Sequence, residues 1–150
     1  MAEANSVTSV TEPALDDEYP DDSRDEAAVR SVNRSFYEAF EARGLDAMSD
    51  VWEHADRVSC THPGWRTLHG WGAVSGSWFA LFAGPSPQQF ILTNEVVTVA
   101  GDTAWVAVDE NLISVEGGGT VAALNVFVRA GDRWRCVAHH GSAVAPEADN

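Results

Sequence analysis

The segment from Cys60 to Trp65 carries the side chains of this chain best suited to chemistry. It reads Cys60-Thr-His-Pro-Gly-Trp65, so an imidazole lies two residues from a thiol at the end of an expected strand. Pro63 cannot donate a hydrogen bond to a sheet ladder, so we expect the strand to end there and leave His62 at its rim. Histidine titrates near neutral pH, which suits proton transfer. His62 is our first candidate for a general acid or base, and the alternative is a histidine that hydrogen-bonds the backbone.

Cys60 lies on the same strand face as His62, because side chains repeat every two residues along a strand. A thiolate nucleophile is one interpretation, but the pattern favours a small, buried and unreactive cysteine. His54 and His69 lie nearby in the sequence. Their spacing matches neither a zinc finger nor a His-Glu-x-x-His helix, so we expect no metal and no organic cofactor.

Three further polar residues occur in apolar, alternating segments of the second half. Glu110 falls on an apolar strand face, where a carboxylate must be protonated, paired with an arginine or close to water. Asn125 alternates with apolar residues and could orient a carbonyl or hydroxyl, or bond across the sheet. In the last strand, His140 falls on the mainly apolar face and His139 on the other. We therefore predict that His140 points inward and take it as a further catalytic candidate.

The spacing of apolar residues predicts the elements that must position these groups. Repeats of three and four residues predict helices, at 25–44, 45–52 and 70–82. Alternation predicts a short strand at 57–61 and four longer ones, at 90–99, 103–115, 121–129 and 134–142. Sequential strands joined by tight turns pair in antiparallel fashion. The pattern therefore predicts an α+β fold, with three N-terminal helices packed on one face of a curved antiparallel sheet.

Composition divides the chain into three parts. Residues 1–23 carry seven acidic side chains and few large apolar ones, which predicts a disordered acidic tail. Residues 24–145 are expected to form one domain, long enough to bury a core without disulfides, so we expect Cys60 and Cys136 to be reduced. Residues 146–150 are expected to form a short C-terminal tail.

Charge and hydropathy exclude several function classes. The net charge of −14 argues against nucleic acid as a partner, because phosphate contacts need clustered basic residues. The chain has no lysine, which excludes a Schiff-base enzyme and a phosphate-binding P-loop. No apolar run approaches the roughly 18–20 residues of a membrane span, and the N-terminus shows no secretory signal. We expect a cytoplasmic protein with neither a membrane nor a nucleic-acid partner.

In the order of its motifs, the chain resembles the nuclear-transport-factor-2-like (NTF2-like) superfamily, and within it the SnoaL-like and ketosteroid-isomerase-like proteins. The motifs that carry the resemblance are Phe36-Tyr37-Glu38-Ala39-Phe40, Gly44-Leu45-Asp46-Ala47-Met48, the strand ending His62-Pro63, Asn125-Val126-Phe127-Val128-Arg129 and His140-Gly-Ser142. The resemblance implies a conical cavity between a curved sheet and its helices, often in a dimer. Its members include enzymes and non-catalytic scaffolds, so it does not fix the function.

The resemblance also assigns positions to the isomerase residues. His62 stands where the isomerases carry a general-base aspartate, and Asn125 where they carry the aspartic acid that donates to an oxyanion. Their helix-borne tyrosine donor falls at Phe36, with Tyr37 expected to point elsewhere. Phenylalanine cannot donate a hydrogen bond, which argues against steroid isomerisation. The scytalone-dehydratase-like relatives are similar in using histidines in the same cavity, which keeps dehydration open.

Two functional hypotheses result. The first is a small cofactor-independent enzyme that dehydrates, isomerises or cyclises an apolar carbonyl or hydroxyl compound. In it His62 moves the proton, and Asn125 or Glu110 holds the oxyanion or the leaving hydroxyl. The second is a non-catalytic domain that binds a small apolar molecule or acts as a dimeric scaffold, and a homodimer is expected in either case. The predicted cavity walls are Cys60, Trp65, Trp78, Phe82 and Phe36.

Overall fold

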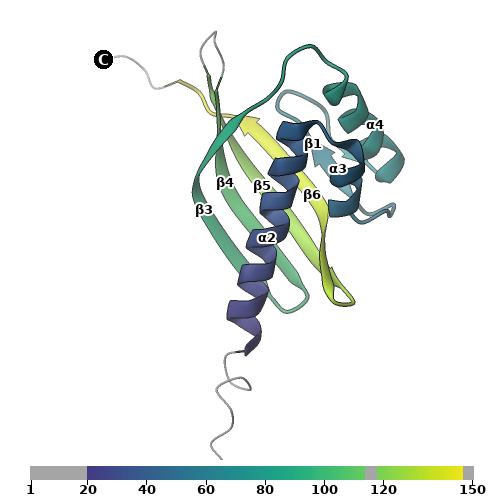
Figure 1. Ribbon diagram of the computed structural model, residues 1–150, viewed down its shortest axis with the longest axis vertical. Coiled ribbons are helices and arrows are strands. Elements are labelled where there is room, and N and C mark those ends of the chain that lie inside the picture. Colours follow the sequence, from purple (N-terminus) through teal and green to yellow (C-terminus); the bar gives the residue numbers. More distant parts are fainter. Residues whose placement is uncertain (1–19, 114–117, 147–150) are drawn as a thin grey trace, which may run out of the picture.

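Three helices and a six-stranded sheet form the part of the chain that the structure describes. The computed structural model describes residues 20–113 and 118–146 (Figure 1). The helices are α2 (Pro20–Ala42), α3 (Leu45–Val51) and α4 (Trp71–Phe82). The strands are β1 (Ser59–Thr61), β2 (Leu68–His69), β3 (Phe90–Ala100), β4 (Thr103–Leu112), β5 (Thr120–Ala130) and β6 (Arg133–Ala143). The predicted α+β fold, with three helices and a largely antiparallel sheet, is confirmed.

The sheet has the order β2-β1-β6-β5-β4-β3. Strands β3 to β6 form the predicted antiparallel meander. Strand β1 pairs parallel with β6, so the segment before His62 lies beside the last strand. Strand β2 was not predicted, because two residues are too few to show an alternating pattern. Because β1 pairs with β6, the segment that carries His62 lies next to residues of β6 on the same face of the sheet.

Helix α2 crosses one face of the sheet, while α3 and α4 cover β1 and the adjoining part of β6 (Figure 1). Helix α2 ends because Arg43 adopts a left-handed conformation, with φ of 54°. The Gly44 N–H donates to the Ala39 carbonyl at 3.0 Å. The helix begins at Pro20, inside the stretch predicted as the acidic tail. Residues 1–19 of that tail, and 147–150 of the C-terminal one, lie outside the described residues.

An irregularity in β3 turns a carboxylate towards α2. The register with β4 shifts between Thr93 and Val96, and Asn94 has φ of 56°, a left-handed conformation that asparagine tolerates better than most residues. Glu95 is partly buried and hydrogen-bonds to side chains of α2. The bulge therefore links an edge strand to the helix.

A second irregularity, in β6, reverses the side-chain alternation of the last strand. Val126 pairs with Ala138 and Phe127 pairs with Cys136, so Val137 is an extra residue in β6. After this bulge His139 is buried and His140 is exposed. The prediction that His140 points inward was therefore wrong, because strict alternation from Trp134 holds only as far as Cys136.

The core lies between the helices and the inner face of the sheet. Phe36, Trp52, Trp78 and Phe127 are fully buried there, and the Phe36 ring packs edge-on against Trp78 with 5.5 Å between centroids. Such aromatic side chains supply much of the buried apolar area of a domain this size. Of the described helices, none is long and apolar enough to cross a membrane.

Candidate functional site

A cavity of about 390 Å³ lies at the end of the sheet where β4 and β6 finish and β5 begins. Its volume is at the lower end of the roughly 300–1,000 Å³ that is usual for small-molecule sites. Most of its wall is apolar and includes Phe40, Trp65, Leu81, Phe82 and Phe90. Glu110, His62 and His139 belong to the same lining. A small apolar ligand therefore fits the site, with a few polar groups to orient it.

Glu110 brings a carboxyl group to this cavity from β4. The side chain is buried, and the Tyr37 hydroxyl on α2 donates to its Oε2 at 2.5 Å. Burial raises the pKa of Glu110 to about 7, and the bond from Tyr37, which favours the ionised form, offsets this only in part. Burial also raises the pKa of Tyr37, so its hydroxyl keeps its proton. Glu110 can therefore give or accept a proton at neutral pH.

His62 follows β1 and is held by α4. Its Nε2 lies 2.9 Å from the Ser77 Oγ, and the Ser77 hydroxyl donates to the Val74 carbonyl at 2.6 Å. The single hydrogen of Ser77 is thus used, so Nε2 of His62 must carry hydrogen and donate to Oγ. The rings of Trp65 and Trp78 stand edge-on to the imidazole, with 4.9 and 4.7 Å between centroids. Burial lowers the pKa of His62 to about 4, so the ring is neutral at pH 7.

His139 reaches the cavity from β6. Its ring centroid lies 6.3 Å from that of His62, and its Nδ1 lies 2.5 Å from Oδ1 of Asn125. Burial lowers the pKa of His139 to about 3, and the imidazoles of His62 and His140 lower it further. Two neutral imidazoles therefore line the cavity with Glu110.

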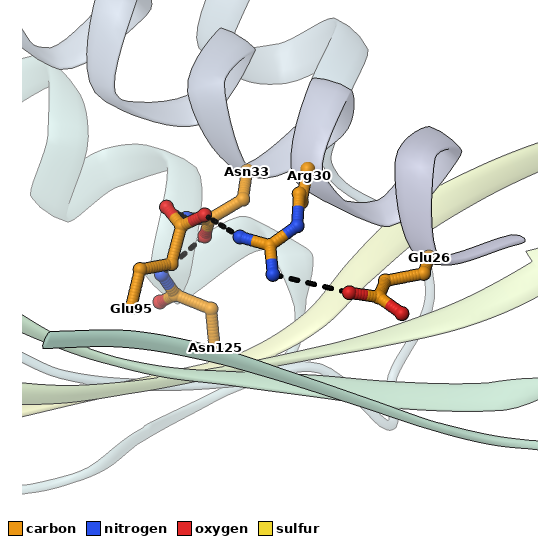
Figure 2. A network of polar contacts seen from close by, with 5 residues as sticks. All are labelled: Glu26, Arg30, Asn33, Glu95 and Asn125. Carbon is orange, nitrogen blue, oxygen red and sulfur yellow. Dashed lines mark hydrogen bonds and ion pairs between the residues drawn. The ribbon is translucent and has the colours of Figure 1, made fainter. Parts of the chain in front are cut away.

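Asn125 lies behind the cavity and does not line it. Its side chain is fully buried, and its Nδ2 donates to Oδ1 of Asn33 at 2.9 Å and to the Tyr37 hydroxyl at 3.2 Å. Its Oδ1 faces Nδ1 of His139. Figure 2 shows the outer part of this hydrogen-bond network, in which Asn33 joins Asn125 to Glu95 beneath α2. Asn125 therefore orients Tyr37 and His139 and has no free polar atom for a ligand.

The family model for the SnoaL-like domain matches residues 29–146, most of the chain. The chain belongs to the SnoaL-like domain family. Among solved structures, a protein of the NTF2-like family from Streptomyces avermitilis is 39% identical with a TM-score of 0.76, over 83% of this chain and 99% of that one. That relative carries a provisional dehydratase assignment. The resemblance to the NTF2-like superfamily is thereby confirmed.

Two other relatives of this SnoaL-like domain have different names. A domain from Thiobacillus denitrificans, provisionally assigned as a calcium/calmodulin-dependent protein kinase type II association domain, is 35% identical with a TM-score of 0.72. The match covers 77% of this chain and 94% of that one. The F-box protein SKIP8 of Arabidopsis thaliana is 32% identical over 117 residues, 78% of this chain and 50% of that protein. The chain thus spans about half the length of this curated relative, and its relatives carry quite different names.

The structure of the SnoaL-like domain brings some of the predicted site residues together and separates others. Those that line the cavity are His62, Glu110, Trp65 and Phe82. Those buried behind it are Asn125, Cys60, Trp78 and Phe36. Cys60, Trp78 and Phe36 were predicted as cavity walls, but all three are fully buried in the core and do not belong to the lining. His140 lies on the opposite face of the sheet.

Cys60 is a buried thiol beneath His62. Its Sγ lies 3.6 Å from Nε2 of that histidine. Burial, together with the charge of Glu110, raises the pKa of Cys60 to about 12, so it stays protonated at neutral pH. Cys136 is also a free, buried cysteine. The structure thus places Cys60 where the sequence favoured it, as a small core residue.

Tyr37 and His139 are the site residues that the sequence analysis missed. Tyr37 was expected to point away from the cavity, but α2 buries two adjacent stripes. Phe36 faces Trp52 and Trp78, while Tyr37 faces Glu110 on the sheet. Two consecutive aromatic residues in a helix are a signal for such double burial. His139 has no comparable signal, because the bulge that turns it inward leaves no mark in the sequence.

The described residues contain no group of three or more histidine, cysteine, aspartate or glutamate side chains that could hold a metal ion. His62, His139 and Glu110 are the nearest approach to such a set. Each has one polar atom bonded to a protein partner, which fixes the orientation of the side chain.

Proposed function

We propose that this SnoaL-like domain is a small enzyme that uses no organic cofactor and moves a proton on an apolar carbonyl or hydroxyl compound. Glu110 is the single observation that carries the proposal, because its pKa of about 7 suits transfer in both directions at neutral pH. It shares an apolar cavity with the imidazole of His62. Perturbed carboxyl groups in such cavities are typical of catalytic acids and bases.

Dehydration illustrates the proton movements. Protonated Glu110 gives its proton to a ligand hydroxyl as the C–O bond breaks, and Nδ1 of His62 takes a proton from the neighbouring carbon as the C=C bond forms. Water leaves, and the proton on His62 returns to Glu110 to restore the starting state. Isomerisation and cyclisation need the same two groups, with the proton returned to another atom of the ligand.

The apolar wall strengthens both steps. Phe40, Leu81, Phe82 and Phe90 exclude water from the ligand, so hydrogen bonds and charges inside the cavity act in a medium of low polarity. Asn125 contributes indirectly, because it holds Tyr37 against Glu110. The provisional dehydratase assignment of the Streptomyces avermitilis relative supports dehydration as the first reaction to test.

The test is a panel of apolar β-hydroxy ketones incubated with the protein in D₂O at pH 7. Enone formation is followed by ultraviolet absorbance, and deuterium incorporation next to the carbonyl by mass spectrometry. Glu110→Gln keeps the shape of the side chain and an acceptor for Tyr37 but cannot exchange a proton. We expect it to lower turnover by roughly 10²–10⁴-fold while ligand binding persists.

The matched control is Asp109→Asn, which removes a carboxyl group from the neighbouring position, where the side chain points to the other face of β4. It should leave turnover unchanged. If no compound in the panel reacts or exchanges deuterium, or if Glu110→Gln turns over like the wild type, the proposed activity is wrong.

A scaffold function is the second candidate, favoured by the outer face of the sheet. Val96, Trp105 and Leu124 are exposed apolar side chains, and the first and last border a shallow hollow with His140. The Thiobacillus denitrificans relative is provisionally assigned as an association domain, which supports assembly through such a face. We propose a homodimer with this face buried.

Light scattering tests this assembly, since a dimer has about twice the 16.1 kDa mass of one chain. Leu124→Asp places a charge on the face and should yield the single-chain mass without loss of fold. The single-chain mass for the wild-type protein would contradict the dimer.

A further inference from the structure

We infer that the inner end of the cavity binds a pair of hydroxyl groups on an apolar ligand, and that the ligand is therefore a diol or an equivalent dihydroxy compound. This inference names the class of ligand that the cavity holds before reaction, when a hydroxyl and not yet a carbon of the ligand meets Nδ1 of His62, and it rests on the proposed function for its meaning. The inference is based on which atoms donate the hydrogen bonds around His62 and His139. Each ring is left with one nitrogen that carries no hydrogen and has no partner.

The donor in the hydrogen bond between His139 and Asn125 follows from the network in Figure 2, which begins at the surface of the protein. Glu95 pairs with Arg30 at 2.7 Å, and its other oxygen can only accept from Nδ2 of Asn33, at 3.3 Å. Asn33 must then present Oδ1 to Nδ2 of Asn125. Oδ1 of Asn125 is thereby turned to His139, whose Nδ1 must carry hydrogen and donate. The neutral ring of His139 keeps a lone pair on Nε2.

The donor in the hydrogen bond between His62 and Ser77 follows independently, from the contacts of Ser77 within α4. Ser77 uses its only hydrogen on the Val74 carbonyl, so Nε2 of His62 donates to Ser77. The neutral ring of His62 keeps a lone pair on Nδ1. Two separate networks thus leave each imidazole with one nitrogen that can only accept a hydrogen bond.

Both nitrogens remain open to the cavity. Among the described residues, the side-chain nitrogens of Trp52 and Trp78 are sealed from the surface and have no hydrogen-bond partner. Nδ1 of His62 and Nε2 of His139 are not sealed in this way, although no described residue bonds to either atom. Since both rings line the cavity, these acceptors face its interior.

A hydroxyl satisfies such an acceptor, whereas a carbonyl oxygen at the same place would meet a second lone pair. Other residues of the lining carry hydrogen-bond donors, among them Arg43 and Gln88. Arg43 is held at the end of α2, where its guanidinium donates to the Gly84 carbonyl at 2.8 Å. A carbonyl on the ligand therefore fits beside Arg43, and the hydroxyl pair fits beside the two histidines.

The test compares three ligands of nearly equal size by isothermal titration calorimetry at pH 7. They are 4-hexylresorcinol, 4-hexylphenol and 1-hexyl-2,4-difluorobenzene, which offer two, one and no hydroxyl donors. We expect each hydroxyl to tighten Kd by roughly three- to tenfold. Equal affinities for the dihydroxy and difluoro compounds would overturn the inference.

Ring ¹⁵N chemical shifts of the two histidines give a second test that needs no ligand. We expect hydrogen on Nε2 of His62 and on Nδ1 of His139 at pH 7. The reverse form of either ring, or a doubly protonated ring, would overturn the inference.

His139→Phe removes one acceptor and keeps an aromatic ring in the core. It should cost 4-hexylresorcinol about one hydroxyl's worth of affinity, roughly three- to tenfold, and leave the difluoro compound unchanged. Arg34→Gln, on an exposed part of α2, is the control and should change neither. Loss of affinity for both compounds alike would count against the inference.

The binding experiment separates this inference from the proposed activity. Dihydroxy compounds that bind as expected, while no ligand is dehydrated or exchanged, would remove the enzyme proposal and support the inference. Turnover of β-hydroxy ketones without any preference for dihydroxy ligands would do the opposite.

Discussion

The two faces of the sheet differ in how their polar residues are held, although the same strands supply both faces. On the inner face, Glu110, Asn125 and His139 are buried, and each is held by a partner at a short distance. On the outer face, His140 lies among exposed apolar side chains such as Val96 and Leu124. Burying a polar group is costly unless it is hydrogen-bonded, so the inner face tolerates only fixed polar groups. The fixed positions of the polar side chains at the site therefore follow from their burial. Mutations on the inner face should lower the stability of the domain much more than mutations on the outer face.

The largest effect is expected for Asn125→Leu. The change removes one hydrogen bond each from Asn33, Tyr37 and His139 in the core, so the free energy of unfolding should fall by about 3–5 kcal/mol. Urea denaturation monitored by tryptophan fluorescence measures the loss. Asn111→Leu is the matched control from the outer face, because Asn111 also makes several hydrogen bonds but is less buried. It should cost about 1 kcal/mol or less, and equal losses for the two variants would contradict the comparison.

Adjacent histidines on β6 give a second test of the two faces. His139→Ala should destabilise the domain by about 2–4 kcal/mol, because it leaves a cavity against Phe36 and frees the Asn125 amide. His140→Ala should change stability by no more than about 0.5 kcal/mol. Thermal unfolding measures both, and a larger loss for His140→Ala would mean that the bulge at Val137 is absent in solution.

The smallest of the three effects is the pH dependence due to Glu110. Its pKa is raised from 4.5 to about 7 in the folded state, so folding favours the protonated form. The associated stability is complete below pH 4.5 and is lost as the pH rises to about 7. The two buried histidines act in the opposite direction, since their lowered pKa values cost stability as the pH falls below 6.5.

Glu110→Gln isolates this contribution. Relative to the wild type, the variant should gain stability between pH 4.5 and 7.5, by about 2–3 kcal/mol in total, because a shift of one pKa unit corresponds to 1.36 kcal/mol. Denaturation curves at a series of pH values measure the difference. A constant difference between the two proteins across this range would show that Glu110 titrates normally.

Sequence and structure agree on where the candidate residues lie when the local signal is strong, and they differ where packing intervenes. Pro63 marks the end of β1, so the position of His62 could be inferred from the chain alone. Glu110 was identified because a carboxylate on an apolar strand face requires an explanation. Its partner Tyr37 could not be inferred, because which of two adjacent stripes of α2 meets β4 depends on how the helix crosses the sheet.

The amino-acid sequence by itself determined the α+β class, the three helices, the antiparallel meander and an acid–base candidate at its rim. These features depend on periodicity, turn residues and composition, which act over a few residues. Only the tertiary structure decided that His139 rather than His140 faces inward, and that Asn125 supports the site from behind. One extra residue in a strand moves every later side chain to the other face, and only pairing with the neighbouring strand reveals it.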